Sequence, residues 1–149
     1  MHRPPRSPTN IRNPALLAKT FAALSINHYL RETQMKRLLR AISIRQPWVE
    51  LILRGDKKAE YRSRPTRIRE RVYIYASLTP ADWPEAWKKV GMQPGGLPTG
   101  AILGSVQIVD CRWDSRRDAY AYVLKDPKRL SKPLVAKNQP LPGFWRPKL

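Results

Sequence analysis

The side chains best suited to chemistry lie close together in the segment GDKKAEYR, which covers residues 55–62. Arg62 has a planar guanidinium that matches phosphate or carboxylate oxygens. Glu60 can accept a hydrogen bond from the exocyclic amine of a base, or it can orient Lys57. If they converge on an open cleft, Lys57, Glu60 and Arg62 can together bind both base and phosphate, although the pattern of charges alone favours a different arrangement. The alternative is a structural ion-pair network that closes the edge of a sheet.

Lys57 also has the chemistry of a catalytic residue. A lysine that loses water beside a charged partner has a lowered pKa and can serve as a base or a nucleophile. If the chain is an enzyme, Lys57 is its leading catalytic candidate.

A short helix and a strand must position these groups. The helix is predicted over 47–54, because Pro47 suits a first turn and Gly55 supplies a left-handed stop. Trp48, Leu51 and Ile52 form its apolar stripe. From 59 to 64 the period changes to two, which predicts a strand with one face toward the core. Its polar face carries Glu60, Arg62 and Arg64.

Ser43 and Gln46 stand at the start of the predicted helix. A hydroxyl, an amide and free backbone N–H groups at that place can bind an anion. Ordinary capping of the helix is the alternative for both residues.

Arginines and aromatic residues extend the predicted binding surface. A run of arginines can follow a phosphate backbone, although a solvated face gives the same pattern. The run consists of Arg62, Arg64, Arg67, Arg69 and Arg71. Tyr73, Tyr75 and Trp145 can stack on bases, as in the binding of single-stranded RNA. Helical spacing favours core packing for Trp48, Trp83 and Trp87.

The remaining pattern indicates many short elements. Strands are predicted at 38–44, 72–77, 101–111 and 120–124, with brief extended pieces at Val135 and at 144–146. Asp82 and Glu85 form a capping-box pattern for a helix that ends at Gly91. Gly104 indicates a bend or a bulge. The order favours an α+β fold, a small barrel of five to six short strands with two or three flanking helices, over a Rossmann sheet.

Residues 1–34 differ from residues 35–149, which we predict to be the folded domain. The extension is rich in proline and arginine, and disorder is expected. Asn13 and Pro14 can cap a short helix that carries Leu16, Leu17, Phe21 and Leu24. An organelle-targeting segment is an alternative for the extension, and Met35 is an alternative start.

The charge of the chain predicts a polyanionic partner. Lys and Arg number 29 against 11 Asp and Glu, so the net charge is +18. Phosphate contacts release condensed counterions, which favours RNA or a nucleotide or nucleoside as the ligand. No apolar run approaches the roughly 20 residues that a bilayer span needs, so no membrane partner is expected.

Cysteine and histidine usage excludes several chemistries. Cys111 is the only cysteine, so an intramolecular disulfide and a cysteine-based zinc site are excluded. Both histidines, His2 and His28, lie in the extension, and neither a P-loop nor a dinucleotide-binding glycine pattern occurs. We expect a cytoplasmic monomer that needs no metal and no cofactor.

Four segments in register resemble the ASCH family, a branch of the PUA-like superfamily. GDKKAEYR fits the family hallmark G-x-K-x-x-E-x-R through Gly55, Lys57, Glu60 and Arg62. SIRQPWVELIL, LPTGAILGSVQIVDC and the closing VLKDPKRL, KPL and GFWR are similar to the other family segments. The resemblance covers essentially all of 35–149 and implies a curved barrel, a cleft at the hallmark and RNA-related work.

The resemblance also implies an enzymatic alternative. Some relatives resemble amidohydrolases of N4-acylated cytidine, and others resemble ribonucleases. Lys57 is then the central residue, with Glu60 handling protons in an amidase or Tyr61 assisting in a ribonuclease. The chain departs from common members at Tyr75 and Leu78, where histidine and lysine are frequent, and has Glu60 where the acylcytidine branch has threonine.

Overall fold

The computed structural model describes residues 13–149, the side chains of 35–38 excepted. The disorder predicted for residues 1–12 lies outside the described residues. By its internal contacts the chain divides into two units, Met1–Lys36 and Arg37–Leu149. The described elements are α1 (Pro14–Leu38), β1 (Ala41–Ile44), α2 (Trp48–Leu53), β2 (Ala59–Arg62), β3 (Arg71–Ala76), α3 (Pro84–Val90), β4 (Ala101–Asp114), β5 (Ala119–Leu134) and β6 (Phe144–Trp145).

The extension is helical from residue 14 onward, which differs from the expected disorder. Asn13 caps α1 as predicted, because its Oδ1 accepts the backbone N–H groups of Ala15 at 3.1 Å and Leu16 at 3.4 Å. The helix continues far beyond the short segment expected. Residues 15–38 contain neither glycine nor proline, so nothing in the sequence stops the helix.

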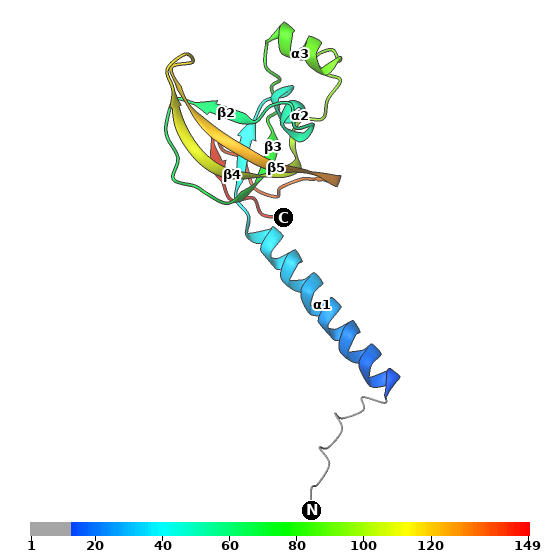
Figure 1. Ribbon diagram of the computed structural model, residues 1–149. Coiled ribbons are helices and arrows are strands. Elements are labelled where there is room, and N and C mark those ends of the chain that lie inside the picture. Colours follow the sequence, from blue (N-terminus) through cyan, green and yellow to red (C-terminus); the bar gives the residue numbers. More distant parts are fainter. Residues whose placement is uncertain (1–12) are drawn as a thin grey trace, which may run out of the picture. The chain divides into compact units, whose positions relative to one another are not determined.

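The second unit is built on one six-stranded mixed sheet in the order β2-β5-β4-β3-β1-β6. The long β4–β5 hairpin curves across its centre (Figure 1). β3 pairs antiparallel with β4, and β1 runs parallel to β3. The α+β class and the number of strands agree with the prediction.

The predicted barrel does not close, and this is a correction. Among the described strands β2 and β6 are the two edges, and no strand pairing joins them. β6 has only two residues, and the preceding segment contains Pro140 and Pro142, which cannot donate backbone hydrogen bonds. The opening between β2 on one side and β1 with β6 on the other is called the seam below.

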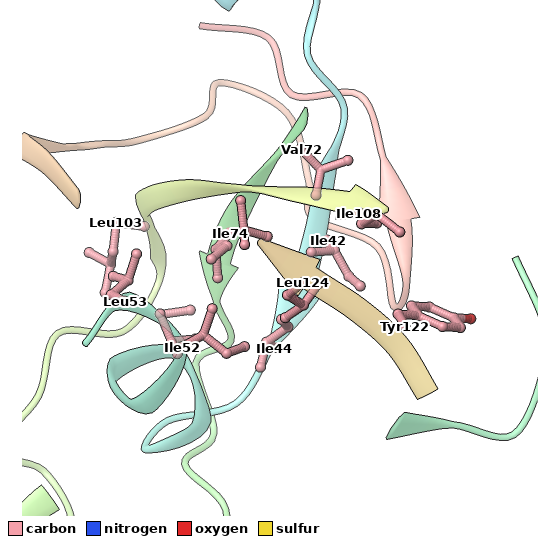
Figure 2. Packing of buried hydrophobic residues seen from close by; sticks show 14 residues of the cluster. Ile42, Ile44, Ile52, Leu53, Val72, Ile74, Leu103, Ile108, Tyr122 and Leu124 are labelled. Atoms are coloured by element: carbon pink, nitrogen blue, oxygen red, sulfur yellow. The ribbon is translucent and has the colours of Figure 1, made fainter. Parts of the chain in front are cut away.

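Apolar residues from five elements fill the interior of the sheet. Figure 2 shows the side chains of α2 meeting those of the strands. The buried set includes Ile42, Ile44, Ile52, Leu53, Val72, Ile74, Leu103, Ile108, Tyr122 and Leu124. This core holds α2 against the sheet, so the turn that follows α2 has a fixed position.

Gly104 permits the close approach of α2, and the bend predicted there is confirmed. The strand register shifts between Ile102 and Gly104. A Cβ at Gly104 lies 2.5 Å from Leu53 Cδ2 and 2.5 Å from the carbonyl oxygen of Lys128. Any larger residue therefore has to push α2 or β5 away.

Glu50 ties α2 to β5 through charge. Arg129 donates from Nη1 to Glu50 Oε2 at 3.0 Å and from Nη2 to Oε1 at 2.8 Å. Arg54 donates from Nε to Oε1 at 3.0 Å. Glu50 is buried, with its carboxylate against Arg129 of β5.

Candidate functional site

A hollow of about 530 Å³ opens at the seam of the sheet. It is called the seam hollow here. Strands β1, β2 and β3 contribute to its wall, and the segment 139–143 forms another side. Its lining residues are Ser43, Ile44, Arg45, Trp48, Glu60, Arg62, Tyr75, Ser77, Leu78, Thr79, Gln139, Pro140, Leu141, Pro142 and Gly143.

Glu60 and Arg62 line this hollow together, whereas Lys57, which was predicted to converge with them, does not. Arg62 Nε lies 3.9 Å from Glu60 Oε1, and Arg62 Nη2 donates to the carbonyl oxygen of Ser43 at 2.6 Å. Glu60 Oε1 accepts the backbone N–H of Tyr61 at 3.0 Å. Glu60 is only 8 % exposed, yet its Oε2 has no hydrogen-bond partner among the described residues. The wall of the hollow thus includes a carboxylate with one buried oxygen that has no donor among the described residues.

The predicted faces of β2 need a correction. The polar face was predicted to lie opposite the face that packs on the core. Glu60 on this polar face is nevertheless the buried residue of the strand, whereas Tyr61 on the other face is partly exposed. The reason is the seam, where β1 and the segment 139–143 enclose the polar face. β2 ends at Arg62, so Arg64 lies beyond the strand.

Ser43 positions the wall of the hollow. Its Oγ donates to the carbonyl oxygen of Leu141 at 2.7 Å and accepts from Trp145 Nε1 at 3.0 Å. Its backbone N–H donates to Gly143. The hydroxyl therefore holds the segment 139–143 in place.

Tyr75 lines the hollow, and Trp145 supports it from behind. Their rings meet edge to face, with centroids 5.4 Å apart and an interplanar angle of 88°. Both residues are buried. Burial raises the pKa of Tyr75, which keeps the phenol protonated.

Lys57 lies in a second, neighbouring hollow of about 560 Å³, called the aromatic hollow here. Its Nζ is 5.1 Å from the ring centroid of Trp48 and 4.8 Å from that of Tyr61. The residues that line this hollow are Trp48, Leu51, Asp56, Lys57, Lys58, Ala59, Glu60, Tyr61, Trp83, Lys89 and Arg117. Trp48 and Glu60 line both hollows. Lys57, Glu60 and Arg62 are thus spread over two adjacent hollows that share Glu60.

The environment of Lys57 lowers its pKa below the ordinary lysine value. Burial lowers the pKa of Lys57, and the charges of Arg117 and Arg62 act in the same direction. The Glu60 carboxylate opposes them. Gly55, with φ of +82°, turns the chain after α2 and so directs Lys57 toward this hollow.

Other predicted site residues lie elsewhere. Gln46 is fully buried, donates from Nε2 to the Pro98 carbonyl at 3.0 Å and accepts the backbone N–H of Glu50 at 3.1 Å, which matches the capping alternative. Arg64 and Arg67 are exposed and line neither hollow. Tyr73 is buried in the core and offers no face to a base.

Sequence reasoning missed several lining residues. Trp83 was expected in the core, but it is 57 % exposed and lines the aromatic hollow. Arg117 reaches the same hollow from the turn between β4 and β5, with its guanidinium carbon 4.3 Å from the Tyr61 ring centroid. Only tertiary structure brings this turn to β2. For the segment 139–143 the proline pattern QPLPG was an available signal.

The described residues, 13–149, contain no group of three or more His, Cys, Asp or Glu side chains placed to hold a metal ion. None of their helices has both the length and the apolar character required for a membrane span.

Comparison with known proteins identifies the family. A model of the ASCH domain matches residues 42–132, so the chain belongs to the ASCH domain family. The chain is 32 % identical over 80 residues to human activating signal cointegrator 1. That match covers 47 % of this chain and 14 % of the human protein, so the chain spans a small part of this relative.

A solved structure supports the fold. The crystal structure of ASCH from Zymomonas mobilis superposes with a TM-score of 0.51 and 16 % sequence identity. The match covers 74 % of this chain and 87 % of the other. At this identity the likeness bears on the fold alone.

Proposed function

We propose that this ASCH domain binds RNA or a nucleotide, with one unpaired base and its phosphate in the seam hollow. The observation that carries the proposal is Glu60, a residue of the hollow wall beside Arg62, whose buried Oε2 has no hydrogen-bond partner among the described residues. A buried polar group left unpaired costs about 1–3 kcal/mol, a cost that a ligand N–H removes. The net charge of +18 favours a polyanion.

In this proposal each group has a role. Glu60 accepts from an exocyclic amine of the base, and Arg62 with Arg45 attracts the phosphate. Tyr75 contributes ring surface at the wall, but Trp145 packs against it, so Tyr75 is held rigidly. Ser43 acts by fixing the segment 139–143 and has no free donor for the ligand.

The test is a titration of a short labelled single-stranded RNA at about 50 and 200 mM salt, where phosphate contacts differ strongly in strength. We expect Arg62→Ala to weaken binding about tenfold, which is typical of an arginine that contacts nucleic acid. Arg62→Lys keeps the charge but loses the bond across the seam and is expected to weaken binding less.

Lys132→Ala is the matched control. Lys132 is an exposed cation of β5 that lines neither hollow, and its loss removes one unit of charge as Arg62→Ala does. A similar loss of affinity in both variants indicates a diffuse charge effect and contradicts the proposed site. Undetectable or salt-independent binding by the wild-type chain contradicts RNA binding itself.

A second candidate is hydrolysis of RNA or of a modified nucleoside, with Lys57 as base. The observation in its favour is burial of Lys57, which lowers its pKa, beside the carboxylate of Glu60. Incubation with N4-acetylcytidine and with RNA separates an amidohydrolase from a ribonuclease. Turnover that is lost in Lys57→Ala supports this candidate, and turnover that survives removes Lys57 from the mechanism.

A further inference from the structure

The aromatic hollow has no role in the proposed binding of one nucleotide. It is similar in volume to the seam hollow, at about 560 Å³ against about 530 Å³. Trp48 and Glu60 belong to both walls, so the two hollows are neighbours across these residues. Each has the size of a small-ligand site.

The aromatic hollow contains an open stacking surface. Trp83 is 57 % exposed, although a tryptophan side chain usually buries most of its area. Its ring lies 6.3 Å from that of Trp48, tilted by 54°, so Trp48 supports it without covering it. Trp83 immediately precedes α3, and Trp87 of that helix is buried, which fixes the position of the exposed ring.

The charges of this hollow decide which kind of guest fits. Lys57 and Arg117 lie over the ring of Tyr61, and Lys57 also lies over Trp48. These aromatic faces are therefore already used by cations, and a cationic guest such as a methylated amine is repelled. Lys58 and Lys89 add positive charge, against the carboxylates of Asp56 and Glu60. A neutral planar ring joined to a phosphate fits this combination.

Arg117 is held in place by its own turn. Asp114 Oδ2 accepts from Arg117 Nη1 at 3.0 Å, and Asp114 Oδ1 accepts the backbone N–H groups of Arg116 at 3.0 Å and Arg117 at 3.2 Å. The turn between β4 and β5 therefore presents its arginine to Tyr61 with little freedom. This wall of the hollow is preorganised for a ligand.

We propose that the aromatic hollow is a second base-binding subsite, in which the neighbouring base of a single strand stacks on Trp83. This inference rests on the proposed function of the seam hollow. The ligand is then a single-stranded segment of at least two consecutive nucleotides rather than a free nucleotide. The base in the aromatic hollow is held by stacking on Trp83 and not by specific hydrogen bonds, so this subsite accepts any base.

The test compares a cytidine monophosphate with a cytidine-containing dinucleotide by calorimetry on the 149-residue chain. The wild-type chain is expected to bind the dinucleotide about tenfold more tightly, the gain that stacking of one base provides. Trp83→Ala is expected to remove this gain and to leave the affinity for the monophosphate unchanged. Trp83→Phe keeps a ring and is expected to retain most of it.

Trp113→Ala is the matched control, because Trp113 is 53 % exposed on β4 and lines neither hollow. It is expected to change neither affinity. Arg117→Ala, away from α3, serves as a second variant if Trp83→Ala does not fold, and is expected to weaken dinucleotide binding alone.

The outcomes separate the two proposals. A dinucleotide advantage that persists in Trp83→Ala or Arg117→Ala, or that is absent from the wild type, overturns the second subsite. If Arg62→Ala weakens neither ligand while Trp83→Ala weakens the dinucleotide, the second subsite stands and the seam hollow loses its assignment. No binding of either ligand overturns both.

Discussion

Glu60 is the residue on which the proposed site depends. Its Oε1 is used within β2, whereas its Oε2 is buried without a donor among the described residues. An unpaired buried acceptor lowers the stability of the free protein until a ligand donates a hydrogen bond to it. Binding residues commonly lower stability in this way.

Glu60→Gln is expected to weaken the binding of bases with an exocyclic amine about tenfold, because the amide places a donor or a weaker acceptor against that amine. The wild-type preference for cytidine monophosphate over uridine monophosphate should shrink in the variant. Competition titrations of the two nucleotides measure it. An unchanged preference means that Glu60 does not contact the base.

Lys57 gives the chain a specific dependence on pH. Because burial, with help from Arg117 and Arg62, lowers the pKa of Lys57 below 10.5, the folded chain releases this proton before the unfolded chain does. Between the folded pKa and 10.5 the unfolded state binds more protons, so the contribution of Lys57 to stability rises with pH.

Lys57→Met removes that titration. The stability of the wild type relative to Lys57→Met should therefore increase as pH rises from 7 toward 10.5, the ordinary pKa of a lysine. Urea unfolding of both proteins at several pH values measures the difference. Groups common to both, such as the buried tyrosines, cancel. A difference that is constant with pH shows that Lys57 is ordinarily solvated.

At the scale of elements, α2 sets the geometry of both hollows because it carries Trp48 and leads into the turn at Gly55. Its attachment to β5 is the contact of Glu50 with Arg129 and Arg54. Burial alone raises the pKa of Glu50, but the hydrogen bonds from Arg129 and Arg54 outweigh it and lower the pKa. The carboxylate thus favours folding at neutral pH.

Glu50→Gln is expected to lower the free energy of unfolding by about 1–2 kcal/mol, because a buried charge pair loses one partner while the two arginines remain partly hydrated. The loss should be full above the ordinary pKa of 4.5. It should vanish as pH falls through the lower, folded pKa, where the wild-type carboxylate is protonated too. Chemical unfolding at pH 7 and in acid checks this. An equal loss at both pH values indicates a packing defect instead.

Elements whose ends or bends are marked by proline or glycine could be predicted from the sequence. Pro47 and Gly55 defined the helix before the hallmark, and Gly104 marked the bend in β4. β5 was predicted over 120–124 but continues to Leu134. The prolines at 127 and 133 argued against a strand, yet a register shift near Asp126, whose φ is +52°, lets the strand continue past the first of them.

Asp82 was expected to cap α3, but Trp83 is the N-cap and no side chain caps the helix.

Which residues lie together at the candidate site could also be predicted in part from the sequence. Glu60, Arg62, Ser43 and Tyr75 line one hollow; alternation along β2 placed Glu60 and Arg62 on one face, and the family resemblance implied a cleft at this segment. Neither source gives the seam that buries Glu60 or the approach of Arg117 to Tyr61, since both depend on contacts between distant strands.

At the scale of the whole molecule, charge and site make separate contributions to binding. The net charge of +18 attracts any nucleic acid, and that attraction weakens steeply with salt. A hollow that holds an unpaired base adds a contribution that depends less on salt and that a duplex cannot provide.

We therefore expect single-stranded and double-stranded RNA of equal length to compete similarly at about 50 mM salt and the single strand to be preferred at about 200 mM. Competition against a labelled single strand at both salt concentrations measures the preference. If the duplex competes equally well at the higher salt, the binding is a property of the surface charge and not of a hollow.

The central claim is that the seam hollow is where the ligand binds, and a chemical-shift map of the labelled chain with cytidine monophosphate tests it most directly. The account predicts that the largest backbone amide shifts fall at residues that line the hollow, which are Ser43, Ile44, Arg45, Glu60, Arg62, Tyr75, Ser77, Leu78, Thr79, Gln139, Leu141 and Gly143. It also predicts that Glu60→Gln reduces them. Shifts confined to the β4–β5 hairpin, or spread evenly over the basic surface, contradict it.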